Sequence, residues 1–171
     1  MTDRSVIHDT FSLERIYPAR PSRVFAAFAS AEAKNAWHAT SEHELAEGEA
    51  GIQEFDFRPG GRERFGVKAR GTTYRYDALY YDIVPDQRIV YSYEMYALDA
   101  RISVSVATIE FTKSGAGTAL TWTEQGAYLD GIDGAQAPAM RVGGTTEHLD
   151  RLTGYLQRNR PETMEFQACE S

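Results

Sequence analysis

The middle of the chain alternates apolar and polar residues with a period of two, and this pattern constrains the fold more than any other feature. Two such segments lie at 74–84 and 88–96, separated by Pro85-Asp86. Others lie at 8–16, 52–57, 65–67, 101–112 and 118–125, with turn residues such as Pro59-Gly60-Gly61 and Ser114-Gly115-Ala116-Gly117 between them. Because short turns join antiparallel strands, the pattern predicts a meander of about six or seven strands.

Helical spacing replaces this alternation in two short segments. After Pro21, Phe25 and Phe28 share one face, and Ser30 begins a second short segment that carries Trp37. The sequence therefore predicts two short helices after the first strand.

A longer helix is predicted near the end of the chain. Leu149, Leu152 and Leu156 recur on one stripe, which is typical of a helix with one buried face. Gly143-Gly144-Thr145 is expected to precede the helix. Residues 128–140 are interpreted as a loop, because they include two Asp-Gly pairs and a proline.

The order of these elements predicts an α+β helix-grip fold. A curved antiparallel sheet must bury its apolar face against the one long C-terminal helix, while the two short helices close the other end of the sheet. The length predicts a single domain over 1–171, with an ordered core at about 8–158 and a loose tail at 161–171.

Composition excludes several classes of partner. The net charge of -7 and the scattered arginines argue against nucleic acid, and Arg62 and Arg64 are expected on the solvated face of a strand. The N-terminal residues lack the apolar run of a signal peptide, and no segment has the ~20 apolar residues that cross a bilayer. We expect a cytoplasmic protein with no membrane insertion. A homodimer is compatible with the sequence.

Several aromatic side chains are expected to face the interior. Strict alternation puts Tyr91 and Tyr93 on one strand face with Ile89, and Trp122 on one face with Glu124. Buried phenol and indole groups need polar partners, which a ligand or ordered water could supply; a filled core is the alternative. The candidate ligand-binding residues are Trp37, Phe55, Tyr76, Tyr91, Tyr93, Trp122, Glu124, His148 and Leu152.

Glu124 is the candidate catalytic residue. Burial beside Trp122 would disfavour its charged form and raise its pKa, which suits proton exchange with a bound carbonyl or hydroxyl. Alternatively, Glu124 lies at the open end of its strand and caps backbone or pairs with an arginine. The sequence leaves both interpretations open.

Patterns for a metal, a cofactor or a nucleophile are missing from the sequence. His38 and His43 lie among three glutamates (Glu42, Glu44 and Glu47) without a His-Glu-x-x-His spacing, and both are predicted to be surface histidines. Cys169 is the only cysteine and is the third residue from the end, so no disulfide or cysteine metal site is expected within one chain. We therefore expect no metal and no cofactor.

Seven features in order resemble a known family. They are PSRVFAAF at 21–28, Trp37, DFRPGGR at 56–62, DIVPDQRIVY at 82–91, ATIEF at 107–111, GTAL at 117–120 and TEQGAYLDG at 123–131. With them the chain resembles bacterial proteins with the Aha1 C-terminal-like domain (activator of Hsp90 ATPase homologue 1-like), in the START/Bet v 1-like superfamily often labelled SRPBCC. The resemblance implies the helix-grip fold with an internal cavity.

The resemblance implies several functions, since this superfamily includes lipid carriers, hormone receptors, polyketide cyclases and co-chaperones. The function expected is binding of a small, largely apolar or amphipathic molecule in the cavity. The alternatives are an enzyme of cyclase, dehydratase or hydrolase type that uses Glu124, and an Hsp90-type co-chaperone or other protein-interaction domain. An Hsp90-type partner is not expected, because the eukaryotic activator has a separate N-terminal domain for which this chain has no room.

Overall fold

The computed structural model describes residues 4–38, 51–69 and 71–160. The strands are β1 (Val6–Tyr17), β2 (Gly51–Phe55), β3 (Arg62–Ala69), β4 (Thr72–Val84), β5 (Arg88–Ala97), β6 (Ala100–Ser114) and β7 (Gly117–Leu129). The helices are α1 (Pro21–Ala29), α2 (Ala31–His38) and α4 (Ala137–Arg158). The predicted tail at 161–171, with Cys169, lies outside the described residues.

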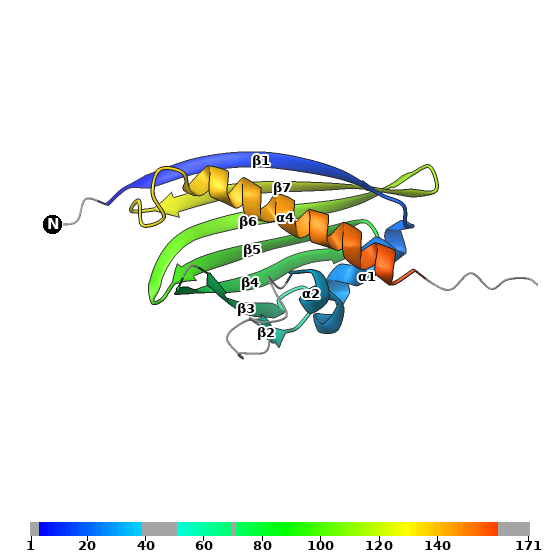
Figure 1. The fold of residues 1–171 in the computed structure, drawn as a ribbon, viewed down its shortest axis with the longest axis horizontal. Helices are drawn as coiled ribbons and strands as arrows, with labels where there is room; N and C mark the ends of the chain where they lie inside the picture. The colour runs from blue at the N-terminus through cyan, green and yellow to red at the C-terminus, as the bar shows by residue number, and fades with distance from the viewer. Residues whose placement is uncertain (1–3, 39–50, 70, 161–171) are drawn as a thin grey trace, which may run out of the picture.

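The seven strands form one antiparallel sheet in the order β1-β7-β6-β5-β4-β3-β2. Each strand from β2 to β7 pairs with its neighbour in sequence, whereas β1 pairs with β7, from Val6 opposite Leu129 to Tyr17 opposite Thr118. Helix α4 crosses one face of this curved sheet, and α1 and α2 lie together at one end of it (Figure 1). This arrangement confirms the predicted helix-grip α+β fold.

The alternation along the central strands places the same side chains inward as predicted. Ile89, Tyr91 and Tyr93 on β5 are all buried, as are Trp122 and Glu124 on β7. The inner face therefore carries rings and a carboxylate as well as aliphatic groups, and each polar atom on it needs a partner.

Helix α4 begins earlier than predicted. The residues interpreted as a loop at 128–140 include the end of β7 and the first turn of α4, where Pro138 fits because the first turn needs no backbone donor. Gly143 and Gly144 consequently lie inside the helix and not before it. Glycine disfavours a helix interior, but the buried stripe of Thr145, Leu149, Leu152 and Leu156 stabilises the helix against the sheet.

The outer surface agrees with the expectations from charge. Arg62 and Arg64 are exposed on β3, and Arg64 forms an ion pair with Asp77 at 2.7 Å. Among the described residues, no helix combines the length and the apolar character needed to cross a bilayer.

Candidate functional site

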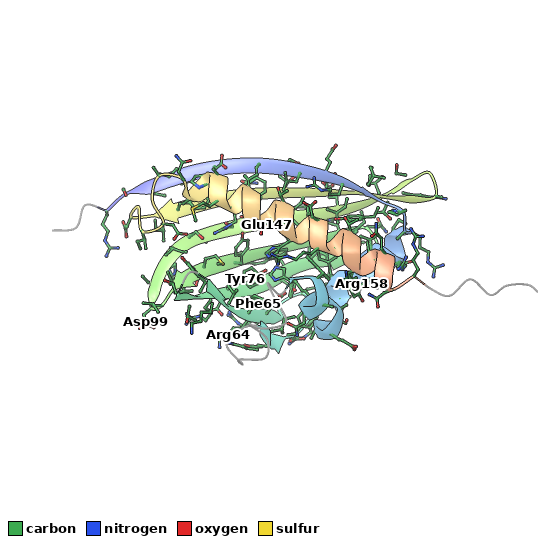
Figure 2. All side chains as sticks on the ribbon, in the orientation of Figure 1. Arg64, Phe65, Tyr76, Asp99, Glu147 and Arg158 are labelled. Atoms are coloured by element: carbon green, nitrogen blue, oxygen red, sulfur yellow. The ribbon has the colours of Figure 1, made fainter. Side chains whose placement is uncertain are left out.

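A pocket of about 330 Å³ lies between the N-terminal half of α4 and the inner face of the sheet. The sheet contributes rings to its wall, and Figure 2 labels Phe65 and Tyr76 on the strands below α4. The helix contributes Arg141, Gly144 and His148, among others. The wall is therefore mostly apolar, with a few polar groups among the rings.

The structure brings five of the predicted residues to this wall: Tyr76, Tyr91, Tyr93, Trp122 and His148. The four rings from the sheet contact one another, with centroids 4.8 Å apart for Tyr76 and Tyr93, 5.9 Å for Tyr91 and Tyr93, and 6.3 Å for Tyr91 and Trp122. Burial raises the pKa values of Tyr76, Tyr91 and Tyr93 well above the usual value of a tyrosine hydroxyl. These phenols stay neutral at ordinary pH and can act as hydrogen-bond donors.

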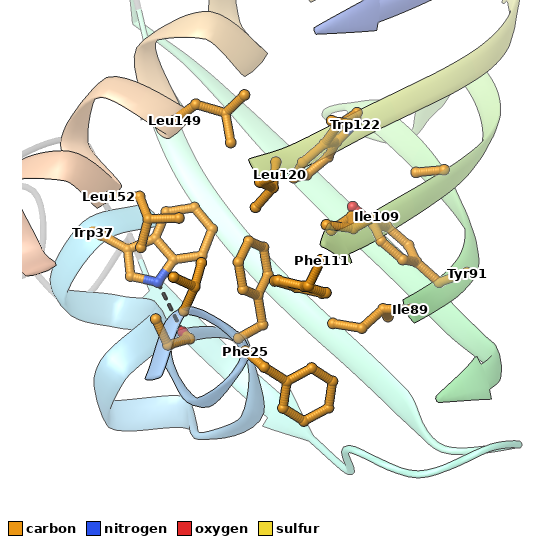
Figure 3. Close-up of a cluster of buried hydrophobic side chains, with 14 of the residues drawn as sticks. Phe25, Trp37, Ile89, Tyr91, Ile109, Phe111, Leu120, Trp122, Leu149 and Leu152 are labelled. Carbon is orange, nitrogen blue, oxygen red and sulfur yellow. Dashed lines mark hydrogen bonds between the residues drawn. The ribbon is translucent and has the colours of Figure 1, made fainter. Parts of the chain in front are cut away.

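Three predicted apolar residues lie elsewhere. Trp37 packs edge-on against Phe28 and donates its indole N–H to the carbonyl of Ala27 at 2.8 Å, so it belongs to the closed core (Figure 3). Leu152 is fully buried in the same core, and Phe55 stacks on Phe57 at the β2 edge of the sheet. Helical or strand periodicity predicts that such side chains turn inward but not whether they meet the pocket or the core.

Glu124 lies behind the pocket wall rather than on it. Its side chain is fully enclosed, accepts a hydrogen bond from the Tyr93 hydroxyl at 2.5 Å and another from the Trp122 indole at 3.3 Å, and forms an ion pair with Arg141 at 3.0 Å. Both alternatives raised by the sequence are thus partly right, since the residue is buried beside Trp122 and also paired with an arginine.

Sequence reasoning missed Arg141, because it lies between the predicted loop at 128–140 and the glycine pair expected to mark the helix entry. The guanidinium also donates to the hydroxyls of Tyr93 at 2.6 Å, Ser105 at 3.0 Å and Ser103 at 2.7 Å. The signal that could have found it is the spacing of buried helix positions, since residue 141 lies four before Thr145 and eight before Leu149 on the same stripe.

His38 and His148 stack on each other beside the pocket, with ring centroids 4.1 Å apart. The prediction that His38 is a surface histidine is wrong, because α2 turns it against Phe65 and His148. Burial lowers the pKa of His148 to about 3 and that of His38 well below its usual value, and the nearby charges of Lys34 and Arg151 act in the same direction. Both rings are neutral at ordinary pH.

No metal site emerges from the part of the chain that the structure describes. Within 4–38, 51–69 and 71–160, no three His, Cys, Asp or Glu side chains gather closely enough to hold an ion. His43 and its neighbours Glu42, Glu44 and Glu47 lie outside these ranges.

A second buried ion pair lies away from the pocket. Lys34 on α2 meets Glu63 on β3 at 2.6 Å, and the Tyr80 hydroxyl donates to the same carboxylate. Neither member of the pair lines the pocket. This pair joins α2 to the sheet, as Arg141 and Glu124 join α4 to it.

Comparisons with known proteins agree with this architecture. The model of the family described as "Activator of Hsp90 ATPase homolog 1-like protein" matches residues 18–157. An uncharacterised protein from Rhizobium leguminosarum is 42% identical with a TM-score of 0.81, over 92% of this chain and 99% of that one.

Two further solved structures extend the comparison. A protein from Rhizobium loti is 44% identical with a TM-score of 0.77, over 89% of this chain and 99% of that one. One from Chromobacterium violaceum is 25% identical with a TM-score of 0.67, over 85% and 94%. No curated protein matches the chain. The chain therefore belongs to the activator of Hsp90 ATPase homologue 1-like family of the SRPBCC superfamily, whose fold commonly binds ligands.

Proposed function

We propose that this protein binds a small, largely apolar molecule in the pocket beneath α4. The observation that carries the proposal is the wall itself, in which Phe65, Tyr76, Tyr91 and Trp122 surround a space of about 330 Å³. That volume is at the lower end of pockets that hold small organic molecules, about 300–1,000 Å³. Apolar burial at about 25 cal/mol per Å² is adequate for micromolar affinity once the costs of association are subtracted.

The missing side chain of Gly144 contributes to this space. Gly144 lies on the pocket wall, and a Cβ atom added to it would meet no other atom within 4 Å. Gly143, the neighbouring residue, is exposed to solvent, and a Cβ atom there would also meet nothing within 4 Å. The two positions thus accommodate a Cβ atom equally well, but only a side chain at position 144 starts from the pocket wall.

This pair gives a matched test of the proposal. We expect the uncharged fluorescent probe Prodan to bind the wild-type protein, and Gly144→Leu to weaken binding about tenfold or more because the leucine occupies ligand space. Gly143→Leu should leave the affinity unchanged. Fluorescence titration measures both, with circular dichroism as the check on folding. Absence of Prodan binding, or equal effects of the two leucines, would contradict the proposal.

The geometry gives less support to an acid–base enzyme. The carboxylate of Glu124 is enclosed, and the rings of Tyr93 and Trp122 lie on the wall in front of it. Three hydrogen bonds already engage its two oxygens, so we assign Glu124 to holding Arg141 and Tyr93 in place. We therefore propose binding without a catalytic step.

A further inference from the structure

We infer that Glu124 makes the pocket selective for uncharged ligands, because it neutralises the cation on the wall, Arg141. The inference rests on the proposed function and specifies the class of molecule that the pocket accepts. Glu124 acts here as a specificity-determining residue without touching the ligand.

The surroundings of Arg141 show how fully it is engaged. One terminal nitrogen of the guanidinium contacts Glu124, Tyr93 and Ser105, and the other contacts Ser103. The group also lies between the rings of Tyr93 and Tyr128, with distances of 5.2 and 5.4 Å to their centroids. Its side chain keeps 14% exposure, whereas that of Glu124 has none.

An anionic ligand would therefore gain little from this arginine. A carboxylate that approached Arg141 through the pocket would find one terminal nitrogen fully engaged and the other already bonded to Ser103. It would also be repelled by the buried carboxylate of Glu124, which pairs with the same guanidinium. Among the described residues of the wall, the other formally charged side chain is Asp133, which is also acidic. His38 and His148 add no positive charge, since both are neutral.

An uncharged polar group meets a better environment. The wall presents the phenol hydroxyls of Tyr76 and Tyr91, which burial keeps protonated. The hydroxyl of Tyr93 is already held by Glu124 and Arg141. A ligand hydroxyl or amide can hydrogen-bond to the Tyr76 and Tyr91 hydroxyls without bringing an unpaired charge into an enclosed space. The pocket thus fits an apolar molecule with a neutral polar end.

Wild-type protein gives the first arm of the test. 2-Naphthamide and 2-naphthoate have the same ring system and nearly the same shape, but only the second is charged. In competition with Prodan, we expect 2-naphthamide to bind about tenfold or more tightly than 2-naphthoate. Equal affinities, or tighter binding of 2-naphthoate, would overturn the inference.

Glu124→Gln gives the second arm, in which binding is gained rather than lost. Glutamine keeps the shape of the side chain and a carbonyl acceptor for Tyr93 and Arg141, but it removes the charge. We expect 2-naphthoate to bind this variant about tenfold more tightly than wild type, while 2-naphthamide changes by less than about twofold. Glu63→Gln is the matched control, because it removes a buried glutamate whose cation, Lys34, lies off the pocket wall.

The outcomes separate this inference from the proposed function. If Prodan does not bind the wild-type protein, the proposed function fails and the inference fails with it. If Prodan binds but 2-naphthoate competes as well as 2-naphthamide, or gains no affinity in a folded Glu124→Gln variant, only the inference fails. If Glu124→Gln does not fold, the wild-type comparison of the two competitors decides.

Discussion

In the part of the chain that the structure describes, the Lys34–Glu63 and Arg141–Glu124 pairs each combine a cation from a helix with a glutamate and a tyrosine from the sheet. Of the two, the Arg141–Glu124 pair borders the pocket. In the pair away from the pocket, the side chains of Lys34 and Glu63 are 7% and 0% exposed. Tyr80 donates to one carboxylate oxygen, and the other makes no hydrogen bond within the described structure. The charge of Lys34 is therefore used within the closed core, where it holds α2 against β3.

The pocket pair is more fully hydrogen-bonded. Arg141 reaches Glu124, Tyr93 and two serines, because its planar group presents donors in several directions, whereas a lysine presents a point charge. A cation, a glutamate and a tyrosine can thus hold a helix against the sheet in two settings. Around Lys34 they lie in a closed core, and around Arg141 they also form part of the pocket wall. The degree of enclosure separates the two settings.

The largest expected effect comes from removing each cation in turn. Lys34→Met leaves Glu63 charged in a closed core, so we expect the free energy of unfolding to fall by about 3–5 kcal/mol. Arg141→Met should lower it by only about 2 kcal/mol, because Arg141 itself lines the pocket and water can enter the space that its guanidinium leaves beside Glu124. Urea denaturation measures both. The double variant Lys34→Met/Glu63→Leu should recover most of the loss, and an equal loss in the two single variants would remove the distinction between the pairs.

An intermediate effect is expected from the histidine stack, which joins the two helices that carry these cations. His148 has a pKa of about 3 in the folded protein, whereas an unfolded histidine titrates near about 6.5. Below about pH 6.5 the unfolded chain binds a proton that the folded protein does not bind, so the free energy of unfolding falls by up to about 1.4 kcal/mol per pH unit. The stability linked to the neutral His148 ring is therefore fully present above about pH 6.5 and decreases towards pH 3.

His148→Gln tests this pH dependence. The variant should flatten the decline of stability between pH 6.5 and 4.5, measured by urea denaturation at a series of pH values. His8→Gln, at an exposed position on β1, is the control and should keep the wild-type slope. The same slope in all three proteins would show that protonation of the stack does not contribute.

The smallest expected change in the free energy of unfolding comes from alanine substitutions on the two sides of α4. Gly143→Ala and Gly144→Ala should each raise the free energy of unfolding by up to about 1 kcal/mol, because alanine favours a helix interior and neither Cβ atom meets a neighbour. Thermal denaturation should therefore show similar stabilisation on the solvent side and the pocket side. A loss of stability in Gly144→Ala alone would mean that the pocket wall there is closed rather than open.

Alternation and turn residues were sufficient to predict most of the fold. The inward faces of β5 and β7, with Tyr93 and Glu124, followed from a period of two, because a strand that packs on one side leaves no other arrangement. The pairing of Glu124 with Arg141 could not follow in the same way. It depends on where α4 begins, and the glycine pair at 143 and 144 favoured a late start.

The sequence also could not predict which inward-facing side chains line the pocket and which pack in the closed core. Trp37 and His38 are neighbours at the end of α2, yet Trp37 packs into the core while His38 reaches the pocket. A turn of about 100° per helical residue separates their directions, and the tertiary placement of α2 decides what each one meets. Burial could be predicted for Trp37, but not for a histidine beside a polar segment.

The pairing of β1 with β7 also has a consequence for how the chain is made. The partners of this twelve-residue strand are the last strand residues to be synthesised, with Tyr17 opposite Thr118 and Val6 opposite Leu129. Contacts between such distant residues slow folding, because a long loop must close before they form. On the ribosome, β1 emerges before the other strands of the sheet and has no partner until β7 is made. We therefore expect the sheet to be completed only after translation has passed β7. A chain arrested before that point would expose an unpaired strand edge and should be prone to aggregation.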